Sequence, residues 1–286
     1  MGEVPAVSDD LLGLEVSMPN PDSSHLVFVL GCARSGTSIL GETLAAHPGV
    51  HFCFEDNLIW DRAFPDRVDD RLTAEDARAC AVRTVLEDRM ARIAAEADGA
   101  TTVDKNPKHT LRIGFLAELF PEARFVHIIR DGRDAVSSLM FRNRGGEWGH
   151  LKIAGWSDLL ERFPEKNHVR CAHQWRDSVR AARHDGQALG ESRYGELRFE
   201  ALVENALETM QGVLDFIGLP MTTEVEEAAA KIQNATAGSY HAKRQVRHFV
   251  DDHATRVGRH RENLSDEQLA EIMDVCGELL GELGYE

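Results

Sequence analysis

An apolar run that passes directly into a glycine-bounded loop constrains this chain more than any other feature. Residues 26–30 (LVFVL) predict a buried strand, residues 31–36 (GCARSG) a tight loop, and residues 37–46 a helix with apolar side chains on one face. In such a strand–loop–helix unit, the loop N–H groups and the helix N-terminus favour an anion. The stretch therefore predicts a phosphate-binding loop.

The residues inside this loop narrow the kind of phosphate donor. Gly31, Gly36 and Ser38 meet the spacing of triphosphate-binding loops, but Thr37 stands where that motif has its lysine. A cation lies inside the loop instead, at Arg34. We therefore expect a phosphate-bearing donor other than ATP used with magnesium. The alternative is a glycine-containing turn that binds nothing.

Strands and helices alternate along the rest of the chain. This alternation predicts an α/β protein, a P-loop-like three-layer fold with a mostly parallel central sheet flanked by helices. Ligands of such sheets bind beyond the carboxyl ends of the strands. Further strands are expected at 50–54, 101–105, 124–130 and 194–200. Further helices are expected at 73–97, 111–120, 132–141, 165–189, 202–217, and from a capping box of Ser265 and Gln268 to about 283.

Length and composition set the broad class. We expect residues 1–24, which are acidic and contain proline, to form a flexible arm without signal-peptide features, and residues 25–286 to form one domain. No apolar run approaches the ~20 residues of a membrane helix. The five cysteines form no C-x-x-C pair, which argues against a zinc site or disulfide framework and favours the cytoplasm.

Charge is distributed unevenly. The formal net charge of −16 argues against nucleic acid as a partner. Against this background, residues 241–261 hold six lysines and arginines but only two acidic residues, Asp251 and Asp252. We expect this segment to meet an anion, with a solvated basic loop as the alternative.

Charged side chains follow the predicted strands. The first strand leads to the Arg34 loop, the second to Glu55 and Asp56, the third to Lys105, and the fourth to Arg130. Cations can neutralise charge that develops on a leaving phosphate, and a carboxylate can take a proton from an acceptor. These strand ends therefore favour transfer of a charged group from a phosphate leaving group.

With these residues in place, the chain resembles sulfotransferases that use 3′-phosphoadenosine-5′-phosphosulfate (PAPS), in the tyrosylprotein, carbohydrate and related bacterial forms. GCARSGTSIL resembles their 5′-phosphosulfate loop, FVHIIRDGRDAVSS their 3′-phosphate motif, and VGRHRENLS their late glycine-and-basic loop. The motifs reach from residue 26 to beyond 260. The resemblance implies that the donor is bound by Arg34, Ser35, Gly36, Thr37, Ser38, Arg130, Ser138, Gly258 and Arg259.

The resemblance also implies a catalytic set. Glu55 matches the general base of tyrosylprotein-type enzymes, Lys105 the lysine that stabilises the transition state, and Arg34 the arginine of the first loop. Cytosolic small-molecule enzymes place a histidine base where this chain has Pro107. Asp56 is the competitor of Glu55 for the role of base.

Other chemistry-bearing residues have structural interpretations. We expect His109 and His127 to be packed or solvent-linked, Trp175 to lie in the core, and Arg133 to pair with Asp131 or Asp134. Related bacterial sequences often have tryptophan where this chain has His260. We assign a substrate loop to residues 141–164, where Trp148 and Trp156 either stack on an acceptor or anchor the loop, and a nucleotide-closing loop to residues 234–263.

The resemblance implies an enzyme that moves a sulfuryl group from PAPS to an acceptor hydroxyl or amine by in-line displacement. The co-product is adenosine 3′,5′-bisphosphate (PAP), no metal is required, and the acceptor is a small molecule, a sugar or a peptide. Two alternatives remain: a P-loop kinase or nucleotidase on the same architecture, and a catalytically inactive nucleotide-binding module.

Overall fold

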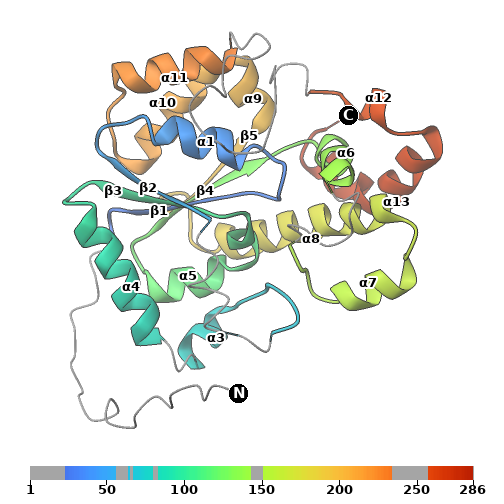
Figure 1. Ribbon diagram of the computed structural model, residues 1–286, viewed down its shortest axis with the longest axis horizontal. Helices are drawn as coiled ribbons and strands as arrows, with labels where there is room; N and C mark the ends of the chain where they lie inside the picture. Colours follow the sequence, from blue (N-terminus) through green and yellow to red (C-terminus); the bar gives the residue numbers. More distant parts are fainter. Residues whose placement is uncertain are drawn as a thin grey trace, which may run out of the picture.

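A parallel sheet runs through the computed structural model, which describes residues 23–55, 64, 67–79, 83–142, 151–233 and 257–285. The described strands form a five-stranded sheet in the order β2-β3-β1-β4-β5 (Figure 1). Every neighbouring pair is parallel, as the alternation of elements predicts. The strands are β1 (Leu26–Leu30), β2 (Val50–Phe54), β3 (Thr101–Lys105), β4 (Arg124–Ile129) and β5 (Tyr194–Arg198).

Helices connect the strands and extend the chain beyond them. They are α1 (Thr37–Leu44), α3 (Ala74–Ala79), α4 (Arg83–Glu96), η2 (Pro107–Leu111), α5 (Ile113–Leu119), α6 (Gly132–Arg142), α7 (Trp156–Arg162), α8 (Asn167–Gln187), α9 (Phe199–Glu204), α10 (Ala206–Ile217), α11 (Thr223–Gln233), α12 (His260–Asn263) and α13 (Asp266–Glu282). In the part of the chain that the structure describes, no helix combines the length and apolar character that crossing a membrane requires.

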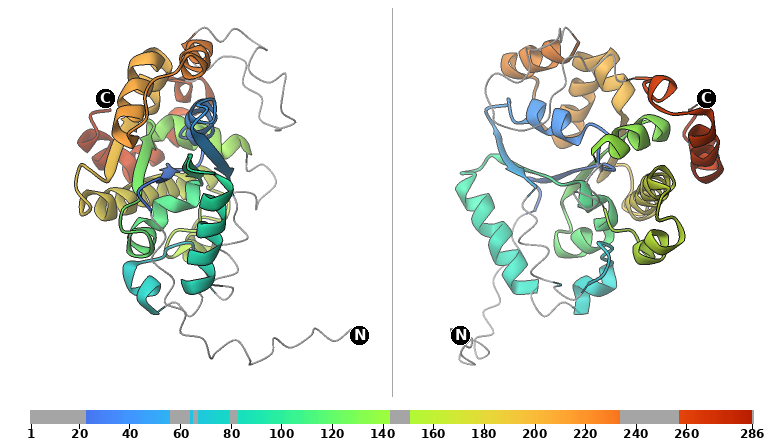
Figure 2. Two further views of the ribbon diagram at one scale, coloured as in Figure 1. Left: turned by 90° about the vertical axis from the view of Figure 1, so that its left-hand side faces the viewer. Right: turned by 45° about the vertical axis from the view of Figure 1, so that its right-hand side comes forward.

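The three layers follow from the alternation of side chains along the buried strands. Val27 and Val29 of β1 point into a core covered by α1, α9, α10 and α11. Leu26, Phe28 and Leu30 point the opposite way, into a core that includes residues of α3, α4, α5 and α8. Figures 1 and 2 show these two groups of helices on opposite faces of the sheet. The predicted three-layer α/β fold is confirmed.

A third core lies beyond the end of β4, among α6, α7, α8 and α13. Trp175 of α8 is fully buried there, and its indole N–H donates to the carbonyl of Arg130 at 3.1 Å. Trp156 is also buried in this core, which supports the anchoring interpretation of that residue. This core therefore carries the first turn of α6 and holds the backbone where β4 ends.

Some elements differ from the sequence-based expectation. Within the range 73–97, the described residues form two helices: α3 lies against α5, whereas α4 lies against β3. The helix predicted at 202–217 breaks at Asn205, whose φ of −132° and ψ of 59° are not helical. Part of the predicted substrate loop is the helix α7, while residues 143–150 with Trp148 lie outside the described residues. So do most of the predicted arm, residues 1–22, and residues 234–256 of the predicted closing loop.

Strand register places the candidate site residues. Lys105, the last residue of β3, is opposite Val29 of β1 and opposite Phe54 of β2. The chain beyond Phe54 stays at this sheet edge, because the N–H of Glu55 donates to the carbonyl of Lys105 at 3.0 Å. The predicted base and the predicted catalytic lysine therefore leave neighbouring strands side by side.

Candidate functional site

The loop between β1 and α1 has the geometry of an anion site. Gly36 is the N-cap of α1, with φ of 98°, and a Cβ there would lie 2.5 Å from the Phe199 ring. Glycine is required on both counts. Gly36 offers no side-chain cap, and the first turn of α1 holds no acidic residue. The N–H groups of this turn, which begin at Thr37, therefore remain available to a phosphate.

Ser35 adds a second indication that this loop suits a ligand. Its side chain is fully buried, and among the residues that the structure describes its hydroxyl has no hydrogen-bond partner. A buried hydroxyl without a partner is costly unless something satisfies it. Thr37 beside it is buried as well, and Ser38 on the next position of α1 is half-buried. The residues present thus fit a phosphate group at this turn.

Lys105 joins the phosphate loop to the candidate base. Its Nζ lies 3.2 Å from Ser38 Oγ and 2.5 Å from Glu55 Oε1. The ammonium also sits 3.7 Å from the centre of the Phe54 ring, in a cation–π contact. The Lys105 side chain is fully buried, whereas the Glu55 side chain is 35% exposed. One buried cation therefore contacts the phosphate loop and a solvent-accessible carboxylate together.

The electrostatics of Lys105 follow from this position. Burial lowers the pKa of the ammonium, and the nearby carboxylate of Glu55 partly opposes that shift. Glu55 itself is held in a left-handed backbone conformation, with φ of 46°. Non-glycine residues adopt this region rarely, and functional sites are enriched in such strain. The Glu55 carboxylate lies beside the lysine at the carboxyl end of β2.

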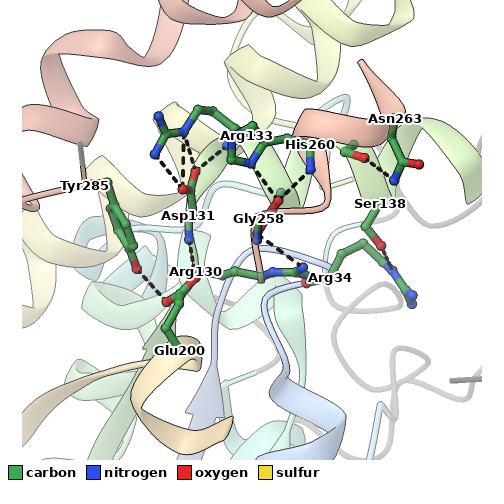
Figure 3. A network of polar contacts seen from close by, with 12 residues as sticks. Arg34, Arg130, Asp131, Arg133, Ser138, Glu200, Gly258, His260, Asn263 and Tyr285 are labelled. Carbon is green, nitrogen blue, oxygen red and sulfur yellow. Dashed lines mark hydrogen bonds and ion pairs between the residues drawn. The ribbon is translucent and has the colours of Figure 1, made fainter. Parts of the chain in front are cut away.

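A second cluster forms around Arg34 and Arg130. The Nε of Arg34 donates to Ser138 Oγ at 3.0 Å, and Nη1 of Arg130 donates to the Arg34 carbonyl, also at 3.0 Å (Figure 3). Arg130 lies over the Phe199 ring, and Asp134 Oδ2 is 3.8 Å from its Nη2. The predicted pair of Arg130 and Ser138 is therefore brought together through Arg34.

The position of Arg34 adds to what its motif indicates. The resemblance assigns Arg34 to the 5′-phosphosulfate end of the donor, yet its side chain contacts Ser138, which is assigned to the 3′-phosphate. Arg34 therefore links the two predicted phosphate positions. Arg34 also has a left-handed backbone conformation, with φ of 75°.

A family profile described as "Sulfotransferase family" matches residues 27–224, which is more than half of the chain. The chain belongs to the sulfotransferase family. A protein-tyrosine sulfotransferase of Drosophila melanogaster is 25% identical over 210 residues, covering 70% of this chain and 39% of the relative. The match to a chicken protein-tyrosine sulfotransferase covers 53% of that relative, so this chain spans about half or less of the length of these relatives.

Solved structures show the same fold. The sulfotransferase domain of the curacin biosynthetic pathway matches with a TM-score of 0.60 and 16% identity, covering 91% of this chain and 97% of that domain. A mouse sulfotransferase complexed with PAP matches with a TM-score of 0.53 and 14% identity, covering 89% of this chain and 84% of the mouse chain.

The late glycine-and-basic motif of this chain lies against the start of α6. The N–H groups of Gly258 and His260 both donate to the carboxylate of Asp134, at 2.7 and 2.9 Å. Asn263 donates to Ser137 Oγ at 3.1 Å. The structure thus brings Gly258 close to Arg130, whereas Arg259 is exposed.

Sequence reasoning missed two residues of this cluster, Asp134 and His260. The sequence indicated Asp134 only as a possible partner of Arg133. In the structure Arg133 pairs with Asp131, and Asp134 accepts hydrogen bonds from the late motif. His260 stood out in the sequence only because related bacterial sequences often have tryptophan at this position. No local sequence signal could have found these contacts, because Gly258 and His260 are 124 and 126 residues from Asp134 along the chain.

Other candidate residues have structural positions. His109 is fully buried, with its Nε2 3.1 Å from Asp104 Oδ2, so it is a packed histidine as expected. His127 is also fully buried, and burial lowers its pKa to about 3. Burial raises the pKa of the Cys32 thiol in the phosphate loop to about 12, which makes it a poor nucleophile. Asp56 lies outside the described residues.

Proposed function

We propose that this protein transfers a sulfuryl group from PAPS to an acceptor hydroxyl or amine. The observation that carries the proposal is Lys105, whose buried ammonium contacts both Ser38 in the phosphate loop and the carboxylate of Glu55. In the proposed reaction, the sulfuryl group moves from a donor at the phosphate loop to an acceptor at Glu55, and Lys105 contacts both ends of that path. Membership of the sulfotransferase family and a neighbouring fold that was solved with PAP support this choice of donor.

The proposed step is an in-line displacement at sulfur. The acceptor oxygen forms a bond to sulfur while the bond between sulfur and the 5′-phosphate oxygen breaks, and that electron pair stays on the phosphate. Glu55 accepts the proton of the acceptor hydroxyl. Lys105 and the N–H groups of the first turn of α1 stabilise the charge that develops on the leaving phosphate. PAP then leaves as the co-product.

The second cluster would hold the other end of the donor. Arg130, Ser138 and Arg34 are close enough to share one phosphate, and arginine binds phosphate oxygens with paired N–H groups. This assignment explains why the site holds separate cationic centres. A kinase would need a lysine at the position of Thr37, and an inactive binding module would need neither Glu55 nor Lys105.

The surroundings of Glu55 favour an acceptor of particular chemistry. Phe54 is 42% exposed, and one face of its ring covers the Lys105 ammonium. An acceptor that reaches Glu55 would pass this ring, which favours an apolar group next to the reacting hydroxyl. The net charge of −16 favours a neutral or cationic acceptor, and the small-molecule, sugar and peptide classes all remain within the proposal.

We also propose that the protein works in the cytoplasm. Support comes from Cys32 and Cys276, two buried cysteines that form no disulfide in the described part of the chain. Fractionation of cells that produce the protein tests this location, and recovery from an extracytoplasmic fraction would contradict it.

Two measurements test the proposed reaction. Calorimetry should show that PAP binds far more tightly than ATP, because only PAP offers a 3′-phosphate to Arg130. Incubation with PAPS and a panel of neutral and cationic hydroxyl compounds should give products heavier by one sulfate in a mass spectrum. Equal affinity for ATP and PAP, without any sulfated product, would reject the proposal.

A further inference from the structure

The Asp134 carboxylate is the meeting point of two segments that are far apart in sequence. Its side chain is fully buried at the start of α6. Oδ2 accepts the Gly258 N–H at 2.7 Å, and Oδ1 accepts the His260 N–H at 2.9 Å. His260 Nδ1 lies 2.8 Å from Oδ1. Figure 3 shows Gly258 and His260 directed toward the first turn of α6, beside Arg130.

The same carboxylate balances the charge of Arg130. Arg130 is only 3% exposed, and burial lowers the pKa of its guanidinium, while the charge of Asp134 opposes that shift. Burial by itself would raise the pKa of Asp134, but hydrogen bonds from His260 and Gly258 and the charge of Arg130 together lower it. Asp134 is therefore a stable anion that interacts with both segments.

Backbone conformation explains why the late segment needs an external anchor. Gly258 is left-handed, with φ of 78°, and a Cβ there would meet nothing within 4 Å. Its conformation, rather than lack of space, requires glycine. The following helix, α12, has four residues, which is too short to hold itself in place. The two backbone N–H bonds that Asp134 accepts, together with the bond that Asn263 donates to Ser137 Oγ, supply the anchor.

We propose that Asp134 is a positioning residue for the donor, which holds Gly258 and His260 against Arg130 and so assembles the wall of the 3′-phosphate site. Asp134 itself touches no donor atom in this arrangement, since its oxygens are occupied by the late segment. This inference rests on the proposed PAPS-dependent function. It goes beyond that function by naming what joins the late motif to the 3′-phosphate motif.

The test is Asp134→Asn in the full chain. Asparagine offers one acceptor and one donor where the structure requires two acceptors, so one of the two N–H groups must lose its bond. Losing a hydrogen bond to a charged group should weaken PAP binding about tenfold or more. Binding of 5′-AMP should barely change, and for sulfate transfer the KM for PAPS should rise with little change in kcat. Asp131→Asn is the matched control, because Asp131 lies in the same motif but pairs with Arg133.

Hydrogen exchange gives a readout that needs no nucleotide. The amides of residues 258–263 should exchange faster in Asp134→Asn than in the wild type or in Asp131→Asn. His260→Gln, which keeps both backbone N–H groups, should show the same changes at smaller size and serves if Asp134→Asn does not fold. Unchanged exchange, or equal losses for PAP and 5′-AMP, would overturn the positioning role. If the wild type does not bind PAP, the proposed function is rejected. The exchange result then still decides whether Asp134 anchors residues 258–263.

Discussion

Two cationic centres at the carboxyl ends of the strands are built in contrasting ways. Lys105 and Arg130 are both buried, and burial lowers the pKa of each. Each has a carboxylate of its own. Glu55, the partner of Lys105, is 35% exposed at the end of β2. Asp134, the partner of Arg130, is fully buried and also binds the late segment.

This difference indicates different tasks. The Glu55 carboxylate beside Lys105 is accessible to solvent, and in the proposed reaction it accepts the proton of the acceptor hydroxyl. The carboxylate beside Arg130 is held by several hydrogen bonds, so that centre keeps a constant charge and shape. A changing charge suits the reaction step, whereas a constant one suits recognition of a phosphate. Variants that separate turnover from donor affinity can therefore break or sharpen the comparison.

The largest effect is expected at the Lys105 centre. Glu55→Gln keeps the shape of the side chain but removes the proton acceptor, so kcat should fall about 10²–10⁴-fold, the usual contribution of general-base catalysis. PAP affinity, measured by calorimetry, should remain nearly unchanged, because the proposed mechanism assigns Glu55 to the acceptor rather than to the nucleotide. Steady-state kinetics with PAPS measure the loss.

Two further variants define the role of Glu55. Lys105→Ala should reduce both turnover and PAP affinity, since its ammonium contacts the phosphate loop as well as Glu55. Near-normal turnover in Glu55→Gln, together with loss of turnover in Asp56→Asn, would assign the base to Asp56. Normal turnover in both Glu55→Gln and Asp56→Asn would show that another residue is the base. The contrast between the two centres would then no longer hold.

A smaller effect, confined to affinity, is expected at the Arg130 centre. Arg130→Ala should weaken PAP binding by roughly 2–4 kcal/mol, the scale of losing charge-assisted contacts in a buried site. Binding of 5′-AMP should change little, because it lacks the 3′-phosphate. Arg133→Ala is the control, since Arg133 belongs to the same motif but pairs with Asp131. Equal losses for PAP and 5′-AMP in calorimetry would show that Arg130 only supports the loop through the Arg34 carbonyl.

No effect is expected from removing divalent metal ions. In the proposed mechanism, Lys105 and the N–H groups of the first turn of α1 supply the positive charge that the leaving phosphate requires. Turnover with PAPS should therefore persist in EDTA, as measured by the rate of sulfate transfer. Loss of turnover in EDTA that magnesium restores would indicate a kinase-like site, and neither cationic centre would then have its proposed role.

Local sequence patterns predicted much of the site because its motifs are contiguous. The residues of the phosphate loop lie within one strand–loop–helix unit, whose geometry is local. Ser265 and Gln268 form the predicted capping box, since both partners lie in a single turn. The break at Asn205 and the helix α7 were not predicted, because packing against distant elements decides where such helices end.

Long-range contacts set the remainder. Arg34 and Ser138 are 104 residues apart, and Asp134 and His260 are 126 apart, so no local pattern could show that their side chains meet. The sequence by itself determined a parallel α/β sheet, a phosphate loop without the triphosphate lysine, and charged residues at successive strand ends, because strand and helix periodicity and glycine spacing are local properties. Only the tertiary structure decided which carboxylate pairs with which cation, because strand register and the packing of α6 against the late segment bring those side chains within bonding distance.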